Sequence, residues 1–292
     1  MIMYRKYSLT IVTLSFIAFY FMTTQVWAAA LPKNNPVPGG IAVIPLGINS
    51  SSVPMVTYRD KRVMVAPDNK GDNQWLAVVG IPLAAKPGKH ELQVESNPKS
   101  QKVTFTVKKK KYKSQYITLK NKRKVNPNKE DLERIGKEKK VIVASLKTWR
   151  ETPEVNTKFV LPVKGRLSSP FGLRRFFNKQ PRKPHSGIDI AAAEGTPIVS
   201  PADGVIVNIG EYFFNGNSIF IDHGQGLVTM YCHMSKINVK EGQQVKQGEI
   251  IGAVGKSGRV TGPHLHWAVS LNDARVDPGL FFENLEKLAK NK

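Results

Sequence analysis

The chain has 292 residues, 41% of them hydrophobic, and a formal net charge of +22 at pH 7. This length is typical of about two domains, and the hydrophobic content suffices for packed cores, which excludes a chain that is disordered throughout. The single cysteine, Cys232, excludes an intramolecular disulfide framework. Stability must therefore come from packed cores and from any bound metal.

Residues 1–28 have the features of a secretory signal peptide. Arg5 and Lys6 form a basic start, and a mostly apolar run, Leu9–Met22, follows. Small residues around Ala28 satisfy the cleavage rule, and the apolar run is short for a membrane span of ~20 residues. We therefore expect cleavage and export to the periplasm or cell envelope, or secretion. A membrane contact is expected only if the segment stays uncleaved.

Residues 34–110 show the pattern of an all-β module. Short β-prone runs recur at about ten-residue spacing between turn clusters. These runs are Ile41–Leu46, Val53–Tyr58, Arg62–Ala66, Trp75–Ile81, Glu91–Val94 and Val103–Val107. The spacing predicts a small antiparallel β-sandwich of the immunoglobulin-like type. With the basic segment that follows, we place this domain at residues 34–127.

The basic segment Lys108–Lys124 carries nine Lys or Arg residues and no acidic residue. Two interpretations stay open: a solvated linker, or a patch that binds anionic polymers of the cell envelope. The large positive charge suggests an anionic partner of some kind. Because an exported protein meets wall polymers and lipid head groups first, we expect no nucleic-acid partner.

Residues 128–150 are predicted to form a helix that links two domains. Asn128 is placed to cap the helix, and Asp131 stands at its third position. Apolar residues fall on one stripe of this helix, namely Leu132, Ile135, Ile142, Leu146 and Trp149. We expect this stripe to pack between the two domains or against one of them.

Residues 161–282 contain short β-prone runs and frequent glycines. We expect residues 283–292 to form a C-terminal tail. The expected strands are Thr196–Ser200, Val205–Ile209, Ser218–Asp222, Leu227–His233, Ile250–Val254 and His264–Ser270. No long amphipathic helix interrupts the series. The fold class is therefore predicted to be mainly β, with an open or flattened all-β barrel, of the barrel/sandwich-hybrid type, as the second domain.

Two short motifs in this domain bring together metal-binding residue types. His185 and Asp189 lie four apart in PHSGIDI, and His264 and His266 lie two apart in GPHLHW. On a strand, residues two apart face the same side, so both imidazoles point into one site. A catalytic zinc needs three protein ligands and an open position. The four residues therefore suffice for a zinc site with one spare histidine for proton transfer.

The segment from Gly165 to Phe282 resembles the lysostaphin-like zinc metallopeptidases, which cut bacterial peptidoglycan. The motifs that carry the resemblance occur in order as SSPFGLR, HSGIDI, TPI-SPADG-V, IDHGQG-TMYCHMS, VK-GQ-VKQGE-IG-VG-SG and TGPHLHW. One departure is Ala268, which stands where an acidic residue often follows, but no departure removes a ligand. The resemblance implies a catalytic domain at residues 161–282.

The resemblance also implies a role for each site residue. His185, Asp189 and His266 correspond to the ligands of one Zn²⁺ per chain, and His233 and His264 correspond to two histidines beside the metal-bound water. No helical glutamate is available as a base, so one of these two histidines takes the proton while the other stabilises the oxyanion. Which histidine does which stays open.

The resemblance implies an exported zinc metalloendopeptidase that hydrolyses the peptide cross-links of peptidoglycan. One alternative is a non-catalytic protein that uses this fold to bind the wall or to activate another wall hydrolase. Two others are a protease of proteins and a carrier domain, the latter suggested by VKEGQQVKQGEIIG. The complete ligand set favours the peptidase.

Overall fold

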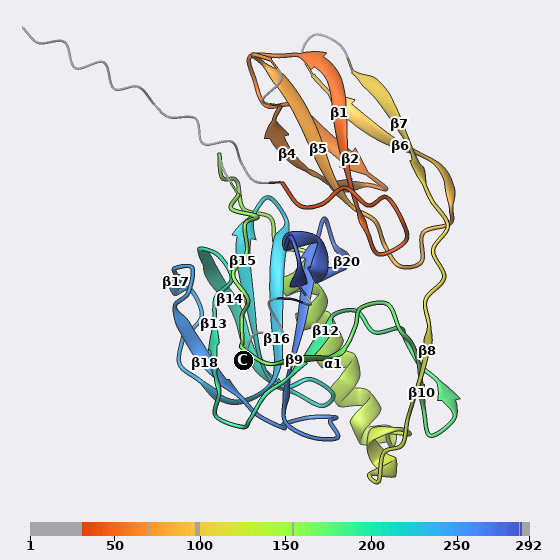
Figure 1. Cartoon of the computed structure of the whole chain (residues 1–292), viewed down its shortest axis with the longest axis vertical. Coiled ribbons are helices and arrows are strands. Elements are labelled where there is room, and N and C mark those ends of the chain that lie inside the picture. The colour runs from red at the N-terminus through yellow and green to blue at the C-terminus, as the bar shows by residue number, and fades with distance from the viewer. Residues whose placement is uncertain (1–30, 69–70, 97–99, 154, 286, 288–292) are drawn as a thin grey trace, which may run out of the picture.

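The structure is a computed structural model that describes residues 31–287 except 69–70, 97–99, 154 and 286. Two β-rich bodies are connected by the basic segment, and helix α1 (Lys129–Leu146) lies on the C-terminal body (Figure 1). The predicted fold class, mainly β, is confirmed. The predicted signal segment lies outside the described residues. In the described part of the chain, no helix combines the length and the apolar character needed to cross a membrane.

The N-terminal body consists of two antiparallel sheets that enclose one core. One sheet has the order β1 (Ile41–Asn49), β5 (Gln74–Gly80), β4 (Met64–Pro67). The other has the order β3 (Lys61–Arg62), β2 (Met55–Tyr58), β6 (Gly88–Glu95), β7 (Gln101–Val107). Buried side chains from both sheets, such as Leu46 and Leu92, share a single cluster. The body is thus a sandwich, and its immunoglobulin-like type stays a prediction.

The C-terminal body is built on one antiparallel sheet. Its path runs β17 (Gln244–Val245), β14 (Gly204–Tyr212), β15 (Gly216–Gly224), β16 (Leu227–Ile237), β19 (His264–Leu271), β12 (Ile188–Ala191), β9 (Arg166–Ser169). Strands β13 (Pro197–Val199), β18 (Ile250–Val254) and β20 (Ala274–Val276) attach beside this path. The path ends at β17 and β9, so among the described strands the expected barrel is an open sheet and does not close.

The basic segment contributes a strand to the C-terminal body. Strand β8 (Ser114–Ile117) pairs in parallel with β10 (Arg174–Phe177), which pairs in turn with β11 (Gln180–Pro181). A short 3-10 helix, η1 (Lys122–Lys124), follows, and a second one, η2 (Pro278–Phe281), lies near the C-terminus. The segment is therefore more than a solvated linker, although its lysines flanking β8 are exposed.

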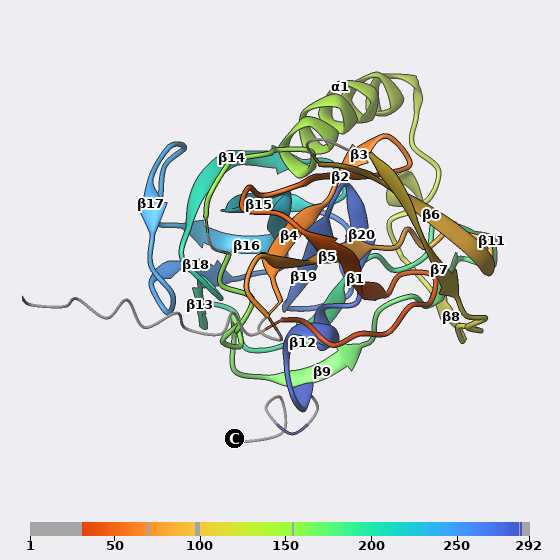
Figure 2. The same cartoon turned by 90° about the horizontal axis from the view of Figure 1, so that it is seen from above.

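Helix α1 begins as the sequence predicts. The Asn128 side chain accepts a hydrogen bond from the Asp131 amide, and the Asp131 side chain accepts one from the Asn128 amide, which completes a capping box. The helix packs against β14 and β16 of the C-terminal sheet, and Figure 2 shows it along one side of that sheet. It ends at Leu146, so Trp149 lies beyond it.

The two bodies are joined by buried hydrogen bonds. Asn272, in the turn between β19 and β20, accepts from the Gly80 amide at 2.6 Å and donates to the Gly80 carbonyl at 2.9 Å. The Val65 amide donates to Gln225 Oε1 at 2.9 Å. Apolar residues of β4 and β5, including Met64, pack into the core of the C-terminal body. The N-terminal sandwich is therefore docked on the C-terminal sheet.

Candidate metal centre

Adjacent strands place the two metal-binding motifs side by side. Strands β12 and β19 are antiparallel neighbours, and their register pairs Asp189 with His266. His185 precedes β12 and approaches β19 through Gly187, where a Cβ atom would lie 2.4 Å from the Trp267 carbonyl oxygen. A residue larger than glycine does not fit at that close approach.

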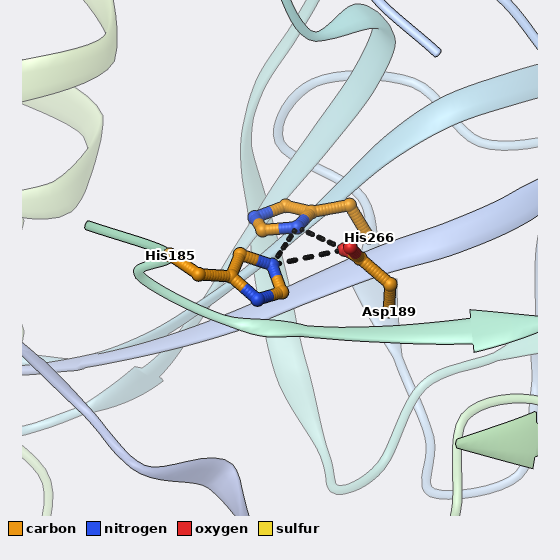
Figure 3. A group of neighbouring side chains, drawn as sticks. All are labelled: His185, Asp189 and His266. Atoms are coloured by element: carbon orange, nitrogen blue, oxygen red, sulfur yellow. Dashed lines mark hydrogen bonds and ion pairs between the residues drawn. The ribbon is translucent and has the colours of Figure 1, made fainter. Parts of the chain in front are cut away.

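Three ligand atoms converge at this point. His185 Nε2 lies 3.0 Å from Asp189 Oδ1 and 3.0 Å from His266 Nδ1, and the last two atoms are 2.7 Å apart. Figure 3 shows the three side chains turned toward one another. Ligands of one tetrahedral zinc lie roughly 3.3 Å apart when each bond is ~2.0–2.1 Å long. Two imidazole nitrogens and a carboxylate oxygen therefore fit a catalytic zinc site.

Neighbouring groups orient two of these ligands. His185 Nδ1 donates to the Pro170 carbonyl at 2.8 Å, which leaves the Nε2 lone pair for a metal. Arg175, from β10, donates from Nη2 to Asp189 Oδ2 at 2.6 Å, so Oδ1 is the oxygen that faces the histidines. Burial would raise the pKa of Asp189, but the contacts of its carboxylate with His185 and His266 hold that pKa well below its ordinary value.

The two remaining histidines lie beside the ligands. The rings of His233 and His264 are 4.8 Å apart at their centroids, and His264 Nε2 is 3.9 Å from Asp189 Oδ1. Each Nδ1 donates to a backbone carbonyl, that of Ser257 for His233 at 2.8 Å and that of Gly262 for His264 at 2.9 Å. Each ring therefore keeps an Nε2 lone pair that can accept a proton. The structure thus brings together all five residues predicted from the sequence.

The backbone of His233 has an unusual conformation. Its φ is +66°, in the left-handed region that a residue with a side chain seldom adopts. It follows Cys232, the last residue of β16 that pairs in register with β19. Burial lowers the pKa of His233 to about 3 and that of His266 to about 4. Both imidazoles are therefore neutral at pH 7, which is the form that binds metal or accepts a proton.

A cleft of about 770 Å³ opens onto the ligand group, and its lining includes His185, His233 and His266. Helix α1 forms one wall with apolar side chains that include Leu132, which is 57% exposed. The apolar stripe of this helix, predicted to pack against a domain, contributes part of its length to the lining of this cleft instead. Arginines from other elements also line the cleft, namely Arg175, Arg182, Arg259 and Arg275.

His223 and Cys232 also carry side chains that can bind metal, but both are buried away from the ligand group. His223 is buried, with Nδ1 donating to the Asp203 carbonyl at 2.8 Å and Nε2 accepting from Thr229 Oγ1 at 2.8 Å. Burial raises the pKa of the Cys232 thiol to about 12, so it is protonated at neutral pH. Neither side chain is part of the convergent ligand group.

Comparisons with known proteins match both bodies. The family model for peptidase family M23 matches residues 183–278, and the model for the family M23 N-terminal domain matches residues 34–110. A crystal structure described as a "putative peptidase M23" from Pseudomonas aeruginosa is 44% identical. It aligns with a TM-score of 0.72 over 85% of this chain and 95% of that chain.

Two curated relatives match part of the chain. DD-carboxypeptidase/endopeptidase Mpg of Neisseria meningitidis is 45% identical over 113 residues, which are 39% of this chain and 26% of that protein. Peptidoglycan DD-endopeptidase ShyA of Vibrio cholerae is 44% identical over 121 residues, which are 41% of this chain and 28% of that protein. The match therefore spans about a quarter of the length of these curated relatives. The Pseudomonas aeruginosa structure matches at 44% identity over 95% of its own length, and both family models match this chain. The chain therefore belongs to peptidase family M23.

Proposed function

We propose that this protein is an exported zinc metalloendopeptidase that hydrolyses peptide cross-links of bacterial peptidoglycan. The observation that carries the proposal is the convergence of His185, Asp189 and His266, whose ligand atoms lie within 3.0 Å of one another. Two further histidines, His233 and His264, lie beside them. Each donates from Nδ1 to a backbone carbonyl and keeps Nε2 as a proton acceptor. The names of the curated relatives, which include peptidoglycan DD-endopeptidase, support this substrate class.

One zinc ion per chain is the proposed cofactor, held by His185 Nε2, Asp189 Oδ1 and His266 Nδ1. When bound, zinc polarises the scissile carbonyl and lowers the pKa of a water molecule from ~15.7 toward ~7. The Arg175–Asp189 ion pair and the His185–Pro170 hydrogen bond hold two of these ligands in place. The site needs little rearrangement to accept the ion.

The remaining steps are proton transfers, for which His233 and His264 are placed. A water that attacks the scissile carbonyl loses a proton, and the Nε2 of either histidine accepts it, because each Nδ1 is already committed to a carbonyl. The imidazolium so formed then stabilises the oxyanion or protonates the leaving amine.

The proposed location is the periplasm or cell envelope, with residues 1–28 as the cleaved signal. Peptidoglycan is the proposed partner at the cleft. The exposed lysines on either side of β8 support a second, weaker contact with anionic envelope polymers through Lys108–Lys124. We propose no nucleic-acid partner, and a membrane contact only if the signal stays uncleaved.

Digestion of isolated sacculi tests the proposal against its alternatives. Purified protein is incubated with sacculi and, separately, with casein, each with zinc or with a chelator. A peptidoglycan endopeptidase releases wall peptides only with zinc and leaves casein intact. A wall-binding protein or an activator sediments with sacculi but releases nothing, and a protease of proteins degrades casein. The His233→Ala variant is the matched control, because it keeps the three proposed zinc ligands.

A further inference from the structure

The Arg259 side chain lines the cleft and packs on two aromatic rings. Its guanidinium carbon lies 4.4 Å from the centroid of the Phe177 ring and 4.2 Å from that of Phe214. The Arg259 amide donates to the Phe214 carbonyl at 2.9 Å, which fixes the backbone of its loop. The guanidinium lies over both rings, and in the described part of the chain none of its N–H groups donates to a protein acceptor. These groups therefore remain available for a ligand.

No carboxylate in the described part of the chain pairs with Arg259. Glu138, an acidic residue that lines the same cleft, accepts from Arg134 Nε at 2.5 Å and from the Phe213 amide at 2.9 Å. Asp189 is engaged by Arg175 and by the histidines. The acidic groups near the cleft are therefore already committed to other partners.

The surroundings of Arg259 make an anion favourable there. Burial and the positive charges of Arg175 and Arg182 lower the pKa of Arg259 to about 10, so the side chain is still charged at neutral pH. The charged side chains that line the cleft are six basic residues and one acidic residue. A partly buried cation surrounded by others gains from an incoming anion far more than an exposed one does.

The loop that carries Arg259 also supports the proposed proton acceptor. The Ser257 carbonyl, two residues earlier, accepts the hydrogen bond from His233 Nδ1 at 2.8 Å. Arg259 lines the same cleft as His233 and His266. A peptide that reaches the metal site through this cleft therefore passes the guanidinium.

We propose that Arg259 is a carboxylate-binding subsite that selects peptides carrying a free carboxylate close to the scissile bond. This inference rests on the proposed function. It narrows the substrate class to wall peptides that carry a free carboxylate and excludes peptides in which that carboxylate is amidated. A guanidinium binds a carboxylate through two parallel N–H···O bonds, an arrangement that a neutral amide cannot reproduce.

The test measures binding, so it does not depend on hydrolysis. The probes are a C-terminally amidated stem tripeptide, alanyl-γ-D-glutamyl-lysine amide, and the same peptide with its glutamyl α-carboxylate converted to a primary amide. Calorimetric titrations use the zinc-loaded full chain and its Arg259→Met, Arg259→Lys and Lys256→Met variants. Methionine preserves the packing between the two rings. Lys256 is the control, because it lies in the same loop but is exposed and paired with Glu194 at 3.0 Å.

The wild-type protein is expected to bind the acidic peptide about 10- to 100-fold more tightly than the amidated one. Arg259→Met should abolish that difference, Arg259→Lys should restore part of it, and Lys256→Met should leave it unchanged. Thermal melts verify that each variant is folded. The proposal is overturned if the wild type does not discriminate, or if Arg259→Met discriminates as the wild type does.

The two proposals fail separately. A wild type that prefers the acidic peptide but releases nothing from sacculi refutes the endopeptidase function and retains the subsite. A wild type that digests sacculi but binds both peptides equally refutes the subsite alone.

Discussion

Replacing Arg175 by methionine tests whether the ion pair behind Asp189 supports the metal site. Arg175 Nη2 lies 2.6 Å from Asp189 Oδ2, and the two side chains are 16% and 10% exposed. The change keeps much of the side-chain length but leaves a buried carboxylate without its cationic partner. Breaking a buried pair from one side typically costs about 3–5 kcal/mol of stability. We expect the chelated protein to lose an amount in this range, reduced somewhat by the remaining histidine contacts.

Zinc binding should weaken as well, because the ion pair orients the carboxylate. Loss of such a supporting contact typically lowers metal affinity about 10- to 100-fold, which corresponds to about 1.4–2.8 kcal/mol. Urea unfolding with chelator measures the first effect, and zinc competition with a chromogenic chelator measures the second. Arg174→Met is the matched control, since Arg174 is the adjacent, exposed residue of β10. A zinc affinity within twofold of wild type, together with a stability loss below about 1 kcal/mol, would refute the reasoning.

Three further predictions concern the ligands, the domain contact and acid stability. Alanine at His233 or His264 should retain zinc but lower wall hydrolysis at least ~100-fold, whereas alanine at any proposed zinc ligand should remove both zinc and activity. Metal analysis of the variants decides between these roles. Loss of zinc from His264→Ala with zinc retained in His266→Ala would mean that His264 is the ligand and His266 is not. Asn272→Gly, which suits the positive φ there, should cost about 2 kcal/mol or more in urea unfolding, because it leaves the buried amide and carbonyl of Gly80 unpaired. Burial lowers the pKa of His223 to about 4, below its unfolded value of ~6.5, so the unfolded state binds more protons between these values. The unfolding free energy of the chelated protein should therefore fall as pH drops from about 6.5 toward 4, and His223→Gln should make that slope shallower; an unchanged slope would contradict this.

Local sequence patterns predicted much of the fold, because helix capping and strand alternation depend on residues that are close together in the sequence. Alternating apolar residues located the strands of the N-terminal sandwich, and the Asn128–Asp131 capping box located the start of α1. The predicted strand Arg62–Ala66 was only partly right, because the strand is interrupted at Val63 and forms two separate strands, β3 and β4. Strand β12, which carries Asp189, was not among the expected strands, since its four residues are too short to show a period.

The candidate site was predictable in its members but not in its surroundings. The i, i+2 spacing of His264 and His266 implied one shared face, and β19 provides it. Arg175 and Arg259 were missed because pairing with Asp189 and placement over Phe214 depend on contacts between distant segments. The doublet Arg174–Arg175 just before the first ligand motif was the available signal for one of them.

The contribution of α1 to the wall of the cleft could not be predicted from local sequence patterns either. Its apolar stripe predicted burial, yet Leu132 faces the cleft and is 57% exposed. An amphipathic pattern shows that a face is covered or used, but it does not show whether protein or ligand covers it. The docking of both bodies through Asn272 depends likewise on a contact across 192 residues of sequence.

Mass spectrometry of muropeptides after digestion of sacculi tests the central claim most directly, because it reports both activity and the bond that is cut. We expect the zinc-loaded protein to convert cross-linked dimers into monomers with their peptide bonds hydrolysed. Chelator or the His266→Ala substitution should prevent this conversion. An unchanged dimer fraction with fully zinc-loaded, folded protein would show that the protein is not an endopeptidase of peptidoglycan cross-links.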